Sequence, residues 1–228
     1  MTWKQVFTSS IGQKITMALT GIFLILFLIV HVGVNALVWA NDGGEMFNRA
    51  GHFLGANVVP RILEVGLFLF ILLHIVQGFV LEAENRTRRS VDYAVNYGNQ
   101  GSKWYSRSMG LLGTLILLFL IIHLIDFWIP SRFGKMPEAT LSDGKQVHNL
   151  YILMQERFQE LWIVIIYVLG CISLAYHLLH GFYSAFKTIG VYNKRYLILI
   201  RWTGYAFAII VSFVFAMMPI SFYFGWVK

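Results

Sequence analysis

Charged residues are scarce in this chain, and their scarcity excludes most soluble folds. Only 13% of the 228 residues are charged, whereas 57% are hydrophobic. A soluble domain carries roughly 25% charged residues. The apolar residues also fall in long uninterrupted runs, which indicates that lipid surrounds much of the protein. The net charge of +7 is therefore expected to set an orientation in a membrane and not to bind nucleic acid.

Cysteine is nearly absent as well. Cys171 is the single cysteine and lies within an apolar run, where a free thiol typically serves as a small packing residue. One cysteine cannot make an intrachain disulfide, a c-type haem attachment motif or a four-thiolate iron–sulfur site. Any redox centre in this chain must use other ligands. The sequence shows neither an internal repeat nor a low-complexity segment, so residues 1–228 are predicted to form one membrane domain.

Five apolar segments are long enough to cross a membrane, which takes about 20 apolar residues in a helix. They cover residues 15–39, 62–81, 108–129, 161–186 and 202–227. The first is too long for the apolar core of a cleavable signal peptide. Tryptophans lie at or just outside the segment ends, where aromatic belts form. The sequence thus predicts an all-α integral membrane protein, an antiparallel bundle of five transmembrane helices.

Lysine and arginine are divided unequally between the two sides of this bundle. Eleven lie in the N-terminal leader and in the connections on its side, and seven lie on the other side. Acidic residues show the opposite bias, three against eight. Because short positive loops stay in the cytoplasm, we expect a cytoplasmic N-terminus and a C-terminus outside. The longest connection, about residues 130–160, then faces outward, and its 146–160 stretch is expected to form a surface helix.

Five of the seven histidines fall inside the predicted helices, and four of them sort by depth. His31 and His123 lie 17 and 16 residues beyond the last inner-side charge of their helices, about 25 and 24 Å from the inner face. His74 and His177 lie eight and ten residues from the inner-side charges of their own helices, about 12 and 15 Å from the inner face. The sequence therefore predicts an outer pair, His31 with His123, and an inner pair, His74 with His177, roughly 10 Å apart.

Two facing imidazoles at each of two depths suit a six-coordinate haem iron, because axial ligands bind from opposite sides of a flat ring. Zinc would need four ligands around one point. A proton relay would usually include more buried carboxylates, and the simplest alternative is that each histidine hydrogen-bonds a neighbouring helix. Close approach of a porphyrin could be allowed by glycines in these helices: Gly21, Gly33, Gly78, Gly110 and Gly113.

The fourth helix carries two histidines, His177 and His180, three residues apart on nearly one face. Only one of them can bond an iron. The other could meet a haem propionate near the inner surface.

With these residues in place, the chain resembles a known family over essentially its whole length. It is similar to the membrane-anchor cytochrome b subunit of succinate:quinone oxidoreductases and quinol:fumarate reductases, of the type with five helices and two haems b. The resemblance rests on residues 9–14 (SSIGQK) before the first helix, on His31, His74 and His123, each the single histidine of its helix, and on residues 176–183 (YHLLHGFY). In the family pattern the fourth ligand lies four residues before a glycine, here Gly181. This makes His177 the ligand and His180 the non-ligand.

The resemblance also implies partners and a location. A flavoprotein subunit would carry the succinate or fumarate chemistry, and an iron–sulfur subunit would relay electrons. Both would lie on the cytoplasmic side of a bacterial inner membrane, against the connections 82–107 and 187–201, and the whole complex could form a dimer. This chain has no cluster cysteines and no dinucleotide fingerprint, in keeping with an anchor. Electrons would pass from the inner haem to the outer haem and to a menaquinone-type quinone.

Candidates for the quinone site lie near the outer side: Glu64, Asp126, Arg49 and His52. Either carboxylate could instead be an interfacial group reached by water, because charge near a helix end costs less than at its centre. Some quinol-oxidising relatives carry a carboxylate two residues before the fourth ligand, where this chain has Ala175, which favours succinate oxidation. A quinol:fumarate reductase anchor, a haem b subunit of another respiratory dehydrogenase and a non-haem membrane protein such as a transporter are the alternatives.

Overall fold

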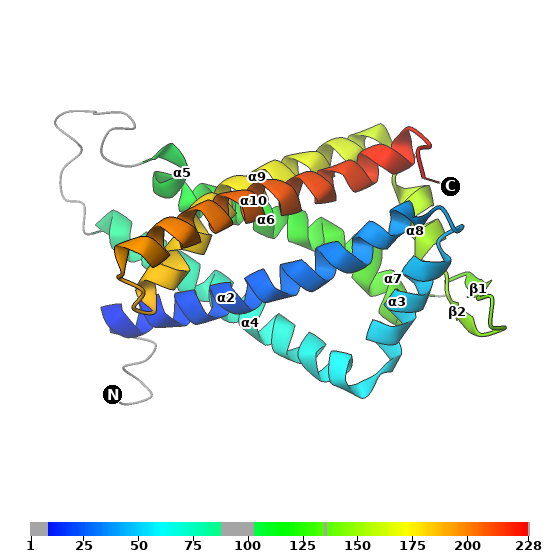
Figure 1. The fold of residues 1–228 in the computed structure, drawn as a ribbon, viewed down its shortest axis with the longest axis horizontal. Coiled ribbons are helices and arrows are strands. Elements are labelled where there is room, and N and C mark those ends of the chain that lie inside the picture. Colours follow the sequence, from blue (N-terminus) through cyan, green and yellow to red (C-terminus); the bar gives the residue numbers. More distant parts are fainter. Residues whose placement is uncertain (1–8, 88–102, 135, 228) are drawn as a thin grey trace. The chain divides into compact units, whose positions relative to one another are not determined.

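The computed structural model describes residues 9–87, 103–134 and 136–227 (Figure 1). Most of this part is helical, with one small two-stranded sheet. Its elements are α2 (Ser10–Ala36), η1 (Leu37–Ala40), α3 (Glu45–Ala56), α4 (Val58–Thr87), α5 (Trp104–Arg107), α6 (Met109–His123), η2 (Leu124–Trp128), α7 (Ile129–Phe133), β1 (Glu138–Thr140), β2 (Gln146–His148), α8 (Leu150–Arg157), α9 (Leu161–Thr188) and α10 (Lys194–Tyr223).

Within the described residues, five helical stretches are long and apolar enough to span a membrane. They are Ser10–Ala40, Val58–Thr87, Met109–Phe133, Leu161–Thr188 and Lys194–Tyr223. Each overlaps one of the five apolar segments, so the chain has the make-up of an all-α, multi-pass membrane protein. Several helices are longer than the predicted apolar segments, because helical backbone hydrogen bonding continues into residues that flank the apolar stretch. The last helix, for example, begins eight residues before the predicted segment.

Contacts between Cα atoms divide the chain into two compact units. The first unit comprises Met1–Phe27, Leu67–Leu115 and Ser173–Ile209, and the second comprises Leu28–Gly66, Ile116–Ile172 and Ile210–Lys228. Each unit takes one segment from each of the five long helices. The inner histidine pair predicted from the sequence falls in the first unit and the outer pair in the second.

Aromatic contacts between helices hold the first unit together. Phe23 of α2 stacks on Phe70 of α4, with ring centroids 4.5 Å apart. Phe182 of α9 packs against Phe207 of α10 at 5.5 Å. Between α2 and α4 there is also a polar tie, since the Gln13 amide donates a hydrogen bond of 2.9 Å to a carboxylate oxygen of Glu84.

The second unit has the larger buried core. It is built from side chains of η1, α3, α8, α9 and α10, centred on Phe158 and Ile163, which are almost fully buried. The Trp39 indole donates to the Ser221 hydroxyl at 3.0 Å and so ties the end of the first span to the last helix.

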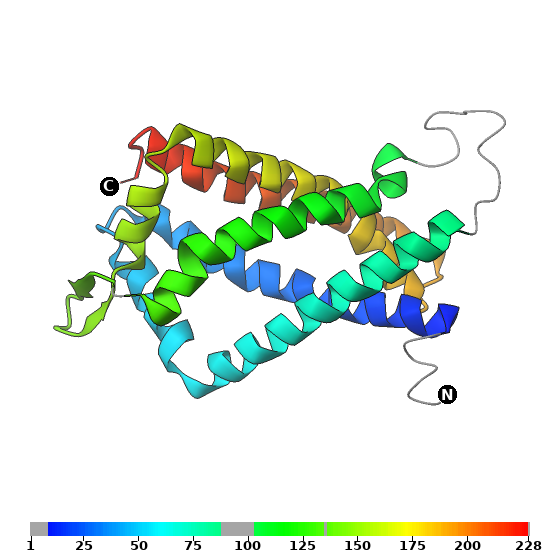
Figure 2. The same cartoon turned by 180° about the vertical axis from the view of Figure 1, so that it is seen from behind.

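Outside the spans, the second unit carries α3, α8 and the hairpin of β1 and β2, which lie next to one another (Figures 1 and 2). The predicted surface helix over 146–160 is shorter than expected, because residues 146–148 pair with 138–140 as a strand. Asn149 then caps α8 by accepting the backbone N–H of Ile152. The sequence did not predict α3, which begins after Gly43 and Gly44 turn the chain at positive φ.

One glycine in the second unit leads to a stability prediction. A Cβ at Gly170 of α9 would lie 2.6 Å from the ring of Phe119, whereas nothing lies within 4 Å of a Cβ at Gly66. Because overpacking of a core typically costs 1–3 kcal/mol, Gly170→Ala is expected to destabilise the protein by about 2 kcal/mol. Gly66→Ala is the matched control. Thermal unfolding in detergent checks this, and equal stability of the two variants would contradict it.

Candidate functional site

In the second unit, His31 of α2 faces His123 of α6. Their ring centroids are 5.8 Å apart and the ring planes are nearly perpendicular, at 88°. Aromatic side chains surround the pair, since Phe215 lies 5.4 Å from His31 and Phe119 stacks on His123 at 5.8 Å. Tyr167 lies 6.1 Å from His123 on another side. Two helices thus bring together the two histidines that the sequence assigned to the outer pair.

In the first unit, His74 of α4 faces His177 of α9 in a similar way. The ring centroids are 6.2 Å apart and the planes meet at 65°. Glycines of two other helices lie beside these rings. A Cβ on Gly21 would lie 3.7 Å from Cε1 of His74, and one on Gly113 would lie 3.9 Å from Cε1 of His177. The ring that faces His74 is therefore that of His177, while His180 lies three residues further along α9.

Both spacings fit one metal ion held between two imidazoles. A bond from a metal ion to an imidazole nitrogen is about 2 Å long, so two rings on opposite sides of one ion have centres roughly 6–6.5 Å apart. The observed separations of 5.8 and 6.2 Å lie close to this value. Rotation of either ring about the common axis leaves the bond intact, so the large interplanar angles are also compatible with it.

Hydrogen bonding bears on the alternative that these histidines only pack helices together. The Nδ1 atoms of His123 and His177 are buried without a hydrogen-bond partner in the described part of the chain. These two atoms therefore make no bond to a neighbouring helix of the kind that a packing role would use, whereas Nδ1 of His74 lies 3.1 Å from Oγ1 of Thr20 on α2. The described residues also contain no cluster of three or more His, Cys, Asp or Glu side chains with the spacing of a metal site. The described residues therefore offer pairs of imidazoles and no zinc-type cluster.

A π-helical turn follows His123 and turns Asp126 inward. Residues Leu124–Trp128 form this turn, η2, a geometry often found at functional sites. The Asp126 carboxylate is buried, forms an ion pair of 2.7 Å with Arg157 of α8 and accepts a hydrogen bond of 2.9 Å from the Tyr167 hydroxyl. The alternative of an interfacial carboxylate reached by water does not hold for Asp126, because its side chain is buried and paired with Arg157 and Tyr167.

Glu64, the second carboxylate among the quinone candidates, is also paired. The Trp128 indole and the Nε of Arg132 donate to one of its oxygens at 2.6 and 3.1 Å. Arg132 and Arg61 reach the other oxygen at 2.9 and 3.1 Å. Four donated hydrogen bonds occupy the acceptor positions of this carboxylate. A quinone that bonded to Glu64 would have to displace one of them.

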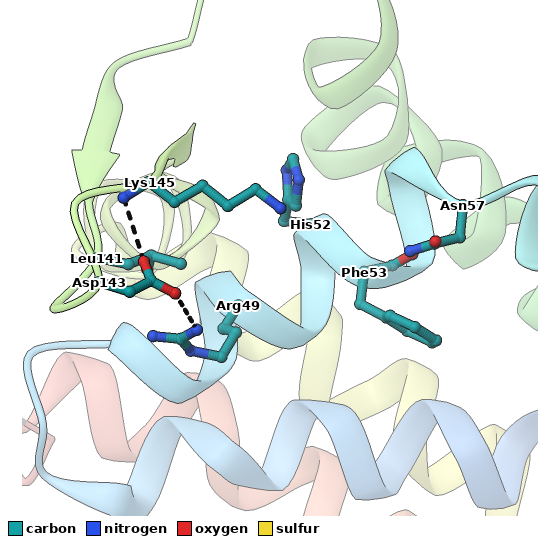
Figure 3. A pocket seen from close by; sticks show the side chains of 7 residues that line it. All are labelled: Arg49, His52, Phe53, Asn57, Leu141, Asp143 and Lys145. Carbon is teal, nitrogen blue, oxygen red and sulfur yellow. Dashed lines mark hydrogen bonds and ion pairs between the residues drawn. The ribbon is translucent and has the colours of Figure 1, made fainter.

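Arg49 and His52, the other two candidates, line one cavity of about 180 Å³ between α3 and the hairpin. Figure 3 shows the Lys145 side chain extending toward His52, and the Arg49 guanidinium facing Asp143. Glu64 and Asp126 do not line this cavity. The four candidates therefore do not form one cluster, because the ion pairs of the two carboxylates lie elsewhere in the unit.

The carboxylates around Arg49 give a pH prediction. The hydroxyl of Ser142 and the guanidinium of Arg49 lower the pKa of Glu45, and Arg49 lowers the pKa of Asp143. Both pKa values lie below those of the unfolded chain, so these contacts stabilise the hairpin at neutral pH. The stabilisation is lost as the pH falls from about 4 through the lowered folded-state values.

Hydrogen exchange of the 138–148 amides, followed from pH 7 to below pH 4, checks this prediction. We expect protection to decrease only at the acid end in the native protein. Arg49→Gln should give weak protection at all pH values, while Arg61→Gln, in the same unit, should keep the native profile. Protection that did not change with pH would contradict the prediction.

Sequence reasoning missed Thr20, Arg157 and Tyr167, which contact the histidines or Asp126. Threonine in an apolar helix is common, and neither Arg157 nor Tyr167 shows a recognisable spacing from His123 in the sequence. The adjacent Thr20 and Gly21 in an otherwise apolar stretch were the available signal for Thr20. Comparison with protein-family models, curated proteins and solved structures finds no match to this chain.

Proposed function

We propose that this protein is a membrane cytochrome b that holds two haems, each between two histidines from different helices. His31 and His123 would bind one iron, and His74 and His177 the other. The observation that carries the proposal is the matching separation of the two imidazole pairs, 5.8 and 6.2 Å. Bound haem would supply one-electron exchange at iron, and two nitrogen ligands leave no open position for oxygen.

Within that class, we propose the anchor subunit of a succinate:menaquinone oxidoreductase in a bacterial inner membrane. The motif around His177, the SSIGQK leader and the whole-chain histidine pattern support this proposal. A flavoprotein subunit and an iron–sulfur subunit would bind on the cytoplasmic side and carry out the succinate chemistry. This chain would bind the haems, keep water away from them and offer a quinone site. The same anchor in a quinol:fumarate reductase is the second candidate.

The surroundings of the two pairs suit this role. Phe119, Phe215 and Tyr167 cover the rings of the second unit with apolar surface. In the first unit, Gly21 and Gly113 let two helix backbones approach the rings. Apolar, water-excluding walls and fixed axial ligands are the means by which a protein tunes a haem potential.

A quinone site is proposed next to Arg49. An open cavity of about 480 Å³ lies there between α2 and α3, lined by Val34, Met46, Arg49, Ala50, Phe53 and Leu54. Ligand sites are typically apolar cavities of 300–1,000 Å³ with a few polar groups. The apolar wall suits a quinone ring, and the Arg49 guanidinium, which already pairs with Asp143 and Glu45, has further N–H groups that would donate to a quinone carbonyl oxygen.

Ala50→Trp tests this location because the indole would fill the cavity. We expect quinone reduction to fall at least about tenfold while succinate still reduces both haems. Ala56→Trp, an exposed position at the end of the same helix, is the matched control and should keep the native rate. A native rate of quinone reduction in Ala50→Trp would show that quinone does not bind in this cavity.

Difference spectra of the complex purified through this chain test the proposed function. Succinate should reduce haem b in the preparation, and a menaquinone analogue should reoxidise it. Reduction by a quinol together with reoxidation by fumarate alone would favour the second candidate. Haem reduced by formate or hydrogen but not by succinate would indicate another respiratory dehydrogenase, and a preparation without haem would overturn the proposal.

A further inference from the structure

The ring of His74 is hydrogen-bonded to a neighbouring helix through Thr20. Among the described residues this is its one such bond. Thr20 lies on α2 and is almost fully buried, with 2% of its surface exposed. Its Oγ1 lies 3.1 Å from Nδ1 of His74 on α4. Both residues belong to the first unit. The other ring nitrogen, Nε2, takes no part in this hydrogen bond.

The direction of this hydrogen bond follows from the other neighbours of the hydroxyl. Thr20 donates to the backbone carbonyl of Thr16 at 2.8 Å, and the carbonyl of Met17 lies at 3.2 Å. A carbonyl oxygen can only accept, and a hydroxyl has one proton to give. The proton of Thr20 is therefore used within its own helix, as is common for threonine in helices. With the proton used in this way, the oxygen offers His74 a lone pair, and we assign the donor role to Nδ1 of His74.

Donation from Nδ1 fixes the tautomer of the imidazole. A neutral histidine carries one proton, so a proton on Nδ1 leaves Nε2 with a free lone pair. A metal-binding histidine generally donates its second N–H to an acceptor, which orients the ring and raises the basicity of the ligating nitrogen. The next residue, Gly21, has no side chain to push the ring aside, since even a Cβ there would lie 3.7 Å from Cε1 of His74.

We propose that Thr20 is a positioning residue that sets the tautomer, orientation and basicity of His74 as an axial ligand of the inner haem. This inference rests on the proposed function. In the opposite ligand, Nδ1 of His177 has no such partner among the described residues. The two ligands of this haem therefore differ, and His74 would be the stronger donor to iron. A stronger donor favours the ferric form and lowers the reduction potential.

The test compares Thr20→Val, which keeps the shape of the side chain and removes the hydroxyl, with Thr20→Ser, which keeps the hydroxyl. In Thr20→Val we expect a higher midpoint potential of the inner haem, a changed low-spin ferric EPR signal and an affinity for that haem lowered about 10–100-fold. Thr20→Ser should restore the native values. Thr114→Val is the matched control, because its hydroxyl donates to Gly110 of its own helix in the same unit.

The outcomes separate this inference from the proposed function. If the native chain binds two haems and Thr20→Val keeps the native potential and EPR signal, Thr20 is only a packing residue and the inference is wrong. An equal change in Thr114→Val would also show that the inference is wrong. A native chain without haem would overturn the proposed function, and this inference with it.

Discussion

Replacement of His74 by alanine is expected to lower the haem content from about two to about one per chain, because it removes one of the two imidazoles proposed to hold that haem between α4 and α9. The remaining haem should be the one bound by His31 and His123, which belong to the other unit. His177→Ala should have the same effect, since the rings of His74 and His177 face each other. Haem quantification and redox titration of the purified variants check this.

His180→Ala is the control that makes the result specific. His180 lies three residues from His177 on the same helix, and the structure directs the ring of His177, not that of His180, at His74. We expect His180→Ala to keep both haems. Loss of the inner haem in His180→Ala with retention in His177→Ala would reverse the ligand assignment and leave the class of protein unchanged.

Replacement of His123 by alanine should separate two electron-transfer steps. The outer haem should be lost, while succinate should still reduce the inner haem through the iron–sulfur subunit. Quinone reduction should fall to the background rate, because the proposed route from the inner haem to quinone passes through the haem that this variant loses. The expected loss of the outer haem follows from the pairing of His31 with His123, whose ring centroids are 5.8 Å apart.

His148→Ala is the matched control for that experiment, since His148 lies in strand β2 outside the spans. It should keep both haems and the native rate of quinone reduction. Undiminished quinone reduction in His123→Ala would contradict the proposed order of electron flow. Loss of both haems in His123→Ala would instead mean that the two sites do not form independently.

The fold and the histidine pairs could be largely predicted because each depends on a simple regularity in the sequence. Apolar runs of about 20 residues have one structural solution in lipid, a helix. Depth along a helix follows from a fixed rise per residue, so counting residues paired His31 with His123 and His74 with His177. Neither step needs knowledge of how the helices pack.

The polar surroundings of the pairs could not be predicted, because they depend on how segments far apart in the sequence meet. The π turn that directs Asp126 toward Tyr167 and Arg157 changes the helical phase by one residue, which regular periodicity does not anticipate. α3 is short, and its position follows from turns at Gly43 and Gly44. The proposed role of Thr20 depends on the use of its single proton within its own helix, which no sequence pattern indicates.

A pyridine haemochrome assay on the purified chain, combined with EPR of the oxidised protein, is the decisive test of the haem assignment. We expect two haems b per chain, one for each imidazole pair, both low-spin with nitrogen ligands on each side. One haem, no haem or a high-spin iron with an open position would contradict the assignment.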